Sequence, residues 1–243
     1  MAVKTITVED LLVLNEEYAG ADAVEILRWS LEHFGESVAL ASSLGAEDMV
    51  ITDMLLKIDP KSRIFTLDTG RLPEETYRVM DRVREKYGVN LEVYFPENDR
   101  VEEMVRSHGI NLFYDSVEYR KLCCFVRKME PLKRALSGLD AWICGLRRDQ
   151  SITRADLAVF EFDESNGRIL KVNPLIDWSE EDVWKYIREN DVPYNELHDK
   201  NYPSIGCEPC TRAIKTGEDI RAGRWWWESP EQKECGLHVK RAR

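Results

Sequence analysis

The sequence has no long hydrophobic run and no recognisable export signal. Within its first thirty residues the longest apolar stretch is Leu11–Leu14, acidic side chains are frequent, and no small-residue cleavage site follows. A helix that spans a membrane needs about 20 mostly apolar residues. We therefore expect no membrane association and a cytoplasmic location, where cysteine thiols stay reduced.

The sequence also lacks an excess of positive charge. Lys and Arg number 34 against 45 Asp and Glu, which gives a formal net charge of -11. Broad electrostatic binding to nucleic acid or to an anionic membrane is therefore not expected. An anionic ligand would need a local basic pocket, and the candidate cations are Arg127, Lys128, Arg147, Arg148, Arg154, Arg221 and Arg224.

Cysteine is scarce, with 6 in 243 residues. A chain of this length buries enough apolar surface to fold without disulfides. In a reducing compartment, clustered cysteines more often hold a metal or perform redox chemistry than form structural bridges. The cysteines are therefore candidates for a functional site.

Apolar segments of strand length alternate with segments of helical length. This pattern predicts an α/β fold, with a mostly parallel twisted sheet and helices on both faces. We expect buried strands at Ser37–Ala41, Arg63–Leu67, Leu91–Phe95 and Ala141–Cys144, and a further strand in KVNPLI, residues 171–176. Helices are expected at Ala46–Lys57, Pro73–Tyr87, Cys123–Leu136 and Trp178–Asn190.

The character of the chain changes after Asn190, where Pro and Gly become frequent. We expect residues 1–190 to form the nucleotide-binding α/β part that carries Cys123 and Cys124. Residues 191–243 are predicted to be a C-terminal segment that builds the site, ending in a mobile ECGLH tail. The whole is expected to be one structural domain.

The segment VALASSLGAEDMVI, residues 38–51, has the pattern of a strand, a short turn and a helix. Such a turn presents backbone N–H groups and a helix N-terminus to an anion, with Ser42 and Ser43 as extra donors. No Lys follows the glycine, so an ordinary triphosphate-binding loop is not expected. An ordinary strand-to-helix turn is the alternative.

Two further strands end in polar loops. LDTGRLPEETY places Asp68 and Thr69 at the carboxyl edge of the sheet, where they could bind ribose or adenine or merely form a turn with a helix cap. GLRRDQSITR brings Arg147, Arg148 and Arg154 into one loop. These guanidinium groups suit phosphate, with salt bridges to Asp149 and Asp156 as the alternative. Together the three strand ends predict one nucleotide pocket.

Four cysteines form two closely spaced pairs, Cys123–Cys124 and the C-x-x-C pair Cys207–Cys210. Four thiolates suit zinc or an iron–sulfur cluster. Adjacent residues do not easily reach tetrahedral positions on one small ion, whereas a four-iron cube offers separate corners. A [4Fe–4S] cluster is therefore favoured over zinc, and buried thiols without a ligand remain an alternative.

The other two cysteines have different surroundings. Cys144 ends an apolar strand and is expected to pack as a small apolar residue. Cys235 lies beside Gly236 and three residues before His238. Cationic neighbours favour the reactive thiolate of a cysteine, and a thiol on a mobile tail can move between two reaction partners. An inert exposed thiol is the alternative for Cys235.

Taken together, the motifs SSLGAED, LDTGRLPEETY, CCFVRKMEPL, GLRRDQSITR, YPSIGCEPC, RAGRWW and KECGLH cover most of the chain. They resemble the assimilatory adenylyl-sulfate (APS) reductases of the iron–sulfur type, within the APS and PAPS reductase family. The Cys-Cys pair with C-x-x-C and the terminal ECGLH are the specific part of this resemblance. The resemblance implies a fold of the adenine nucleotide alpha-hydrolase type, which is related to PP-loop proteins.

The resemblance also implies roles for individual residues. Cys123, Cys124, Cys207 and Cys210 would bind a [4Fe–4S] cluster, and Cys235 would be the nucleophile. The adenylate pocket would contain Ser42, Ser43, Asp68 and Arg154, with Arg147 or Arg148 as the alternative arginine of the loop. The phosphosulfate would be held by Lys128, Arg221, Arg224 and His238, of which Lys128 and His238 count with Cys235 as catalytic.

The expected reaction follows from the same resemblance. Cys235 would attack the sulfur of APS, releasing AMP and leaving an S-sulfocysteine, from which reduced thioredoxin would liberate sulfite. The 3′-phosphorylated nucleotide PAPS, alone or together with APS, is the closest alternative substrate. A tRNA thiolase and a non-catalytic zinc-stabilised interaction module are further alternatives, and formation of a homo-oligomer is left open.

Overall fold

The computed structural model describes residues 6–150 and 157–229, and the chain folds into two compact units. The first unit takes the described residues of Met1–Phe65, Val79–Glu92 and Gly138–Tyr194. The second takes those of Thr66–Arg78, Val93–Ser137 and Asn195–Arg243. The C-terminal segment therefore shares a unit with Cys123 and Cys124, although these cysteines lie far from it in sequence.

A sheet of six strands runs in the order β3-β2-β1-β4-β6-β5. The strands are β1 (Val38–Ala41), β2 (Arg63–Leu67), β3 (Glu92–Tyr94), β4 (Ala141–Ile143), β5 (Phe160–Asp163) and β6 (Ile169–Val172). β1 pairs in parallel with β2 and β4, and β4 with β6, whereas β5 and β6 are antiparallel. The predicted mixed α/β fold with a mostly parallel sheet is confirmed.

The end of β6 differs from the prediction, which extended the strand through residue 176. The strand stops at Val172 because Pro174 has no backbone N–H to donate to a neighbouring strand. The Asn173 side chain instead donates to Ala158 O at 2.9 Å. Edge strand β5 was not predicted, although its sequence FEFD has the alternation of a half-buried strand.

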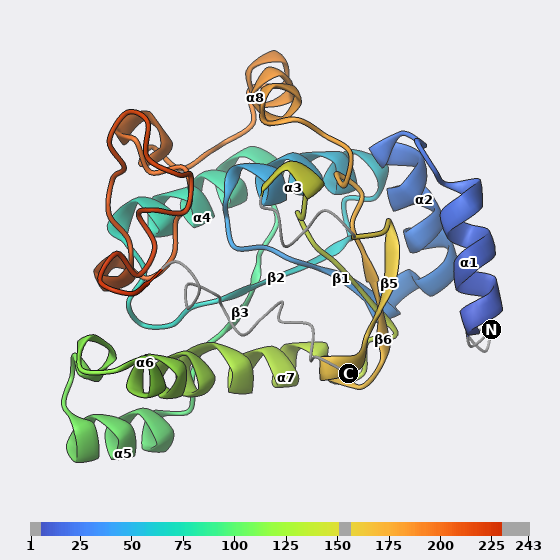
Figure 1. Ribbon diagram of the computed structural model, residues 1–243. Coiled ribbons are helices and arrows are strands. Elements are labelled where there is room, and N and C mark those ends of the chain that lie inside the picture. The colour runs from blue at the N-terminus through green and yellow to red at the C-terminus, as the bar shows by residue number, and fades with distance from the viewer. Residues whose placement is uncertain (1–5, 151–156, 230–243) are drawn as a thin grey trace. The chain divides into compact units, whose positions relative to one another are not determined.

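The helices associated with the first unit begin at residues that suit helix N-termini. They are α1 (Val8–Glu17), α2 (Ala23–Phe34), α3 (Ala46–Ile58), α4 (Glu74–Tyr87), whose first turn lies in the second unit, and α8 (Glu180–Glu189), shown in Figure 1. Asp22 caps α2 together with Glu25, and Ser179 caps α8 together with Asp182. The predicted α3, α4 and α8 are confirmed, whereas α1 and α2 were not predicted.

A buried carboxylate joins three of these helices. Asp53 of α3 is 1% exposed and accepts hydrogen bonds from the hydroxyls of Tyr87 and Tyr186, both at 2.8 Å. Lys57, one turn further along α3, pairs with the same carboxylate at 2.6 Å. Burial raises the pKa of both tyrosines, so they remain hydrogen-bond donors to Asp53.

The second unit carries the helix predicted at Cys123–Leu136, but in three parts. α6 (Val117–Cys124) passes into a π-helical turn, Phe125–Met129, and then into α7 (Glu130–Leu136). In the π-helical turn, Glu130 N donates to Phe125 O, five residues back. The next residue, Pro131, has no backbone N–H and so cannot make an ordinary α-helical bond. α5 (Asn98–His108) of the same unit was not predicted.

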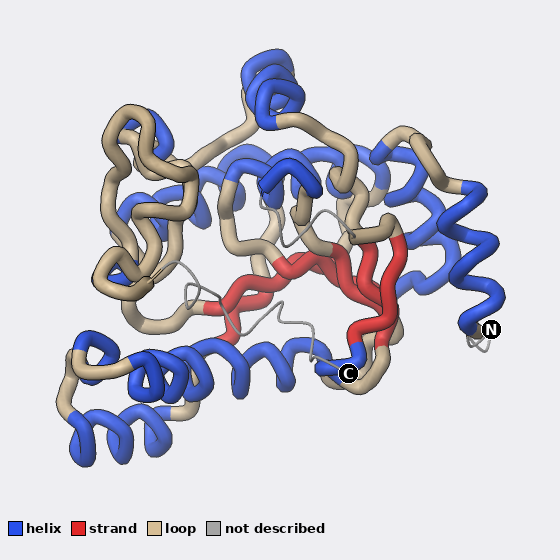
Figure 2. The backbone as a smooth tube through the Cα atoms, in the orientation of Figure 1, coloured by secondary structure: helices blue, strands red, loops and turns tan. Residues whose placement is uncertain are grey.

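The described part of the C-terminal segment consists of short turns, which Figure 2 shows mainly as loop. A bridge between Thr211 and Arg224 closes residues 212–223 into a loop. Position 223 requires glycine, because a Cβ atom there would lie only 2.3 Å from Arg212 O. In the described ranges, no helix has both the length and the apolar character needed to cross a bilayer.

Candidate active site

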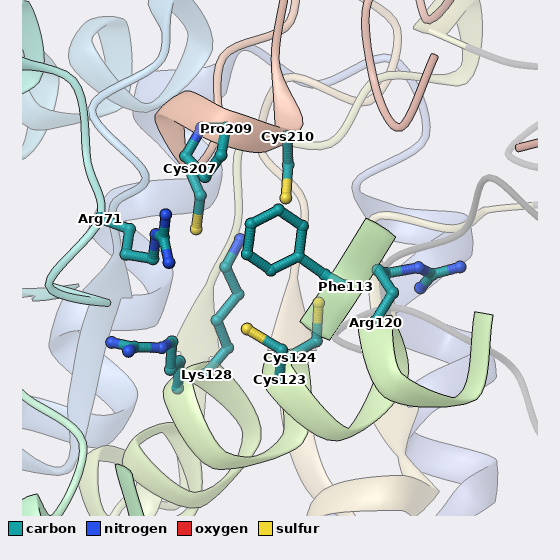
Figure 3. Close-up of a pocket in the computed structure, with 10 residues that line it drawn as sticks. Arg71, Phe113, Arg120, Cys123, Cys124, Lys128, Cys207, Pro209 and Cys210 are labelled. Atoms are coloured by element: carbon teal, nitrogen blue, oxygen red, sulfur yellow. The ribbon is translucent and has the colours of Figure 1, made fainter. Parts of the chain in front are cut away.

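The two cysteine pairs of the second unit face one pocket. Cys123 and Cys124 come from the end of α6, and Cys207 and Cys210 flank a short 3-10 turn. Figure 3 shows the pairs opposite each other, and all four cysteines line the pocket. The remaining lining residues are Arg71, Phe113, Arg120, Arg127, Lys128 and Pro209.

The four thiols share one buried pocket. Among the described residues, no group of three or more His, Cys, Asp or Glu is placed to hold a single ion. The four sulfurs instead surround a shared space, with Cys123, Cys207 and Cys210 each less than one-tenth exposed. A donor set of four soft sulfurs around one pocket suits zinc or an iron–sulfur cluster.

Electrostatics around the pocket oppose free thiolates. Burial raises the pKa of Cys123, and it raises the pKa of Cys210 to about 12, with a further increase from the nearby Cys207 and Cys124. Lys128 acts in the opposite direction on both. Because a bound cation stabilises a thiolate, this cysteine set is suited to ionise together with metal binding.

The LDTG loop is part of the cysteine site. The hydroxyl of Thr69 lies 3.2 Å from Cys207 Sγ, and Thr69 is 1% exposed. Arg127, which follows the adjacent cysteines, donates to Thr69 O at 2.6 Å. Gly70 adopts φ +68°, a backbone conformation that residues with a side chain rarely adopt, and this glycine lies beside Arg127 Nη1.

Asp68, predicted in the adenylate pocket, stabilises the same loop. Its carboxylate accepts from Gly70 N at 2.7 Å and from the Tyr77 hydroxyl at 3.0 Å. Burial, then the bond to Asp68, raises the pKa of Tyr77 to about 12. Asp68 thus has the loop-forming contacts of the alternative interpretation, and a role in nucleotide binding stays a prediction.

Three residues predicted to hold the phosphosulfate, Lys128, Arg221 and Arg224, lie in this unit, and their role in binding stays a prediction. Lys128 lies next to Arg127 on the π-helical turn and extends into the pocket (Figure 3). Arg224 is 8% exposed, donates to Ser204 Oγ at 3.3 Å and stacks on Trp225. Arg221 lies in the turn just before it, with its backbone N–H bonded to Asp219.

A buried ion pair secures the last described residues beside the cysteines. Arg120 of α6 binds Glu228 through two hydrogen bonds, of 2.9 and 2.8 Å. Both side chains are almost fully buried, and Arg120 stacks on Trp225. Residues 225–227 are a run of three tryptophans, of which Trp225 is buried and Trp226 is 40% exposed. The run therefore does not form one uniform exposed surface.

In the first unit, the backbone N–H groups of the Ser42–Gly45 turn are bonded to the turn's own serine hydroxyls or to nearby residues of the unit. Ser43 N and Ser43 Oγ both donate to Asp48 Oδ2 at 2.6 Å. Leu44 N donates to Ser42 Oγ at 3.2 Å and Gly45 N to Ser43 Oγ at 3.4 Å, while Ser42 N bonds Phe65 O. The expectation that this turn offers its N–H groups to an anion is therefore not met in this conformation.

The arginine loop is also internally paired. Arg147 is 2% exposed and binds Glu47 at 3.0 Å, and Glu47 also accepts from Gln150. Arg148 pairs with Asp177 and donates to Leu157 O. A direct role of Arg147 in substrate binding stays a prediction. Cys144, next to β4, is 3% exposed, as expected for a packing residue.

Three predicted site residues lie outside the described residues, namely Arg154, Cys235 and His238. The structure also brings residues to these sites that were not predicted there. Thr69 was expected at the carboxyl edge of the sheet but not beside a cysteine, and Asp48 was visible only as an acid near the start of the predicted Ala46–Lys57 helix. Arg71 and Phe113 stack on each other in the cysteine pocket, and no local sequence pattern marks Phe113.

Fold and site together define an α/β protein with a four-cysteine pocket. Residues 37–213 match the model of the phosphoadenosine phosphosulfate reductase domain. The chain therefore belongs to the phosphoadenosine phosphosulfate reductase family. It is 55% identical over 218 residues to the adenosine 5′-phosphosulfate reductase of Allochromatium vinosum, covering 90% of this chain and 84% of that protein.

Two more distant relatives agree with this assignment. The chloroplastic 5′-adenylylsulfate reductase 1 of Arabidopsis thaliana is 43% identical, over 97% of this chain and 52% of that protein. The crystal structure of phosphoadenylyl-sulfate reductase from Candida auris, in a phosphate complex, superimposes with a TM-score of 0.75. It is 32% identical and covers 88% of this chain and 100% of its own.

Asp48 makes a testable contribution to pH-dependent stability. Burial raises its pKa from 3.8 to about 6, although bonds from Ser43 and Gly145 oppose the shift. Between about pH 4 and pH 6 the folded state binds more protons, so stability decreases as the pH rises. Relative to Asp48→Asn, the wild type should lose about 3 kcal/mol across this window. Urea unfolding at a series of pH values measures the free energy of unfolding of both proteins. A wild-type minus Asp48→Asn difference that does not change between pH 4 and pH 6 would contradict the raised pKa of Asp48.

Proposed function

We propose that this chain is an assimilatory adenylyl-sulfate reductase, which converts adenosine 5′-phosphosulfate to sulfite and AMP. The observation that carries the proposal is the pocket with four cysteines and Lys128, in a chain 55% identical to a protein named adenosine 5′-phosphosulfate reductase. The thiol chemistry of this reaction suits a reducing cytoplasm.

Cys123, Cys124, Cys207 and Cys210 would hold a [4Fe–4S] cluster. Support comes from the convergence of the four sulfurs on one pocket and from the hydrogen-bond distance between Thr69 and Cys207. When bound, the cluster supplies fixed charge next to Lys128, and the electrons for reduction arrive as thiols. Hydrogen bonds to cluster sulfurs tune such centres, which gives Thr69 a definite task.

Cys235 is the nucleophile of the first step. Its thiolate attacks the sulfur of the sulfate group, and a Cys–S bond forms as the bond from sulfur to the phosphate oxygen breaks. AMP leaves with the electron pair of that bond, and the enzyme retains an S-sulfocysteine. Negative charge grows on the departing oxygen, where Lys128, Arg221, Arg224 and His238 supply donors.

Reduced thioredoxin completes the reaction. One of its thiolates attacks the Cys235 sulfur, and sulfite leaves as a mixed disulfide forms. The second thioredoxin thiol then attacks its own half of that disulfide and releases the Cys235 thiolate. The two electrons that reduce the sulfate sulfur thus come from one dithiol, which becomes a disulfide.

PAPS is the second candidate substrate. The observation that favours it is the structural likeness to a phosphoadenylyl-sulfate reductase, at 32% identity. The likeness to proteins named for the unphosphorylated nucleotide is stronger, at 45 to 55% identity. We therefore place APS first, with dual use as the outcome to test.

Replacement of the nucleophile tests the reaction. Cys235→Ser should abolish sulfite release with APS and reduced thioredoxin but leave AMP binding within about twofold, because only the attacking atom changes. Anaerobic sulfite assays, with mass spectrometry of the wild-type intermediate, provide the measurement. Sulfite release at the wild-type rate would refute the role of Cys235.

Equal kcat/KM values for APS and PAPS would replace the strict APS assignment with a dual one.

Metal content tests the cofactor. Anaerobically purified protein should contain about four irons per chain and absorb broadly in the visible range. Cys207→Ser should lose most of this iron, because it removes one of the four thiolate ligands. Cys144→Ala is the matched control, since Cys144 is buried outside the pocket. Colourless protein with one zinc per chain would instead favour the zinc-stabilised module.

Lys128 should act on the sulfate end of the substrate. Lys128→Ala is expected to lower kcat/KM for APS by an amount equivalent to about 2 to 4 kcal/mol, the cost of losing one transition-state donor. The affinity for AMP should decrease less, because AMP has no sulfate group for Lys128 to contact. Lys121→Ala, at an exposed position on α6, serves as the control. Equal losses for APS and AMP binding would place the contact elsewhere.

A further inference from the structure

A buried ion pair and a tryptophan lie against the turn that carries Cys210 in the second unit. Arg120 Nε and Nη2 donate to the two carboxylate oxygens of Glu228 at 2.9 and 2.8 Å, and both side chains are at most 3% exposed. The Arg120 guanidinium also stacks on the Trp225 ring, with 4.8 Å between its Cζ atom and the ring centroid. Glu228 therefore compensates the buried charge of Arg120 while Arg120 packs on Trp225.

Trp225 has an unusual backbone conformation. Its φ angle is +41° although it carries a large side chain, and it is 1% exposed. A bulky residue rarely adopts such a conformation, which persists only where the surrounding contacts impose it. Trp225 N donates to Cys210 O at 3.2 Å, and Glu228 N donates to Trp225 O at 2.9 Å. These two bonds, together with the stacking of Arg120, fix the position of the indole ring.

Arg224, the residue before Trp225, stacks on the same ring. Its Cζ atom lies 4.7 Å from the ring centroid, and its Nη1 donates to Ser204 Oγ at 3.3 Å. A Cβ atom on Gly206 would lie 2.3 Å from Arg224 Nη2, so the glycine leaves the space that this guanidinium occupies. The side chain of Arg224 is therefore held by a ring, by a hydroxyl and by the shape of the neighbouring backbone.

Together these contacts form a chain that leads from the carboxylate of Glu228 through Arg120 and Trp225 to Arg224. An arginine that must become ordered when its ligand binds loses rotamer freedom, and this loss lowers the affinity. A guanidinium that already rests on a fixed ring has lost that freedom beforehand. Stacking engages the face of the group and not its in-plane N–H donors, which are the donors that bind an oxyanion.

We propose that Arg120 and Glu228 are positioning residues that hold the Arg224 guanidinium in place for its anionic ligand through Trp225. Neither Arg120 nor Glu228 contacts the ligand in this role, and Arg224 is the group that does. Arg120 lines the cysteine pocket, yet its task is to support Trp225. The inference rests on the proposed function for the identity of the ligand, which is the phosphosulfate of APS.

A double-mutant cycle tests the inference by calorimetric titration with APS, in a Cys235→Ser background so that the nucleotide binds without turnover. Glu228→Gln removes the charge that compensates Arg120, and the Kd for APS should rise on the order of tenfold, as expected for one misplaced charge-assisted hydrogen bond. When Arg224→Ala is also present, Glu228→Gln should change the Kd by less than about twofold, because the group on which it acts is absent. A purely structural role would weaken binding equally in both backgrounds.

Glu218→Gln is the matched control. Glu218 belongs to the same C-terminal segment and accepts two hydrogen bonds from Arg212, of 2.8 and 3.1 Å. It supports its own turn, where it also accepts from Lys215 N at 2.8 Å. Its replacement should therefore leave the Kd for APS within about twofold.

A second variant covers the case in which Glu228→Gln does not fold. Arg120→Met combined with Glu228→Leu removes both charges and leaves no buried charge uncompensated. The support of Trp225 by a guanidinium is lost in this variant as well. It should show the same loss of affinity for APS, and the loss should again depend on the presence of the Arg224 side chain.

Hydrogen exchange gives a readout that needs no nucleotide. The amides of Trp225 and Glu228 are both hydrogen-bonded, so they should be protected from exchange in the wild type. Glu228→Gln should raise their exchange rates on the order of tenfold, whereas Glu218→Gln should leave them unchanged. Mass spectrometry of peptides that contain residues 224–228 provides the measurement.

Two results would overturn the inference. One is a folded Glu228→Gln protein whose Kd for APS is unchanged, or has risen equally with and without the Arg224 side chain. The other is unchanged exchange at the Trp225 amide in that variant. A wild-type protein that binds no APS would refute the proposed function, and the exchange rates would still decide whether the Arg120–Glu228 pair holds Trp225.

Discussion

The convergence of two cysteine pairs on one pocket is the constraint on which the second unit depends. Cys123 and Cys124 end a helix, whereas Cys207 and Cys210 belong to a turn far along the chain. Arg127 binds Thr69 O, and the Thr69 hydroxyl lies beside Cys207 Sγ. These contacts join the LDTG loop to both cysteine pairs, so the loop, the π-helical turn and the C-terminal segment form one structural unit.

Internal charge pairing engages two buried arginines of the described residues, Arg120 and Arg147. Arg120 binds Glu228, Arg147 binds Glu47, and both guanidinium groups are almost fully buried. A buried cation is stable only when a partner compensates the loss of water. Counting arginines along the sequence therefore overestimates the positive charge that a substrate can meet.

Sequence periodicity predicted most of the regular elements. β1, β2, α3, α4 and α8 agree with the expected segments because their apolar spacing is local information. Edge strand β5 and helices α1, α2 and α5 were not assigned, and the predicted Cys123–Leu136 helix contains a π-helical turn. Such a turn depends on Pro131 and on packing around the preceding residues, which periodicity does not report.

The sequence by itself determined the mixed α/β class, the pairing of the cysteines by spacing and the family resemblance, because each resides in short motifs. Only the tertiary structure decided which donors remain available. It assigned the N–H groups of Ser43 and Gly145 to Asp48, and it placed Thr69 against a cysteine. The physical reason is that hydrogen bonds and ion pairs between distant residues depend on their positions in space, and a linear pattern of residues does not contain them.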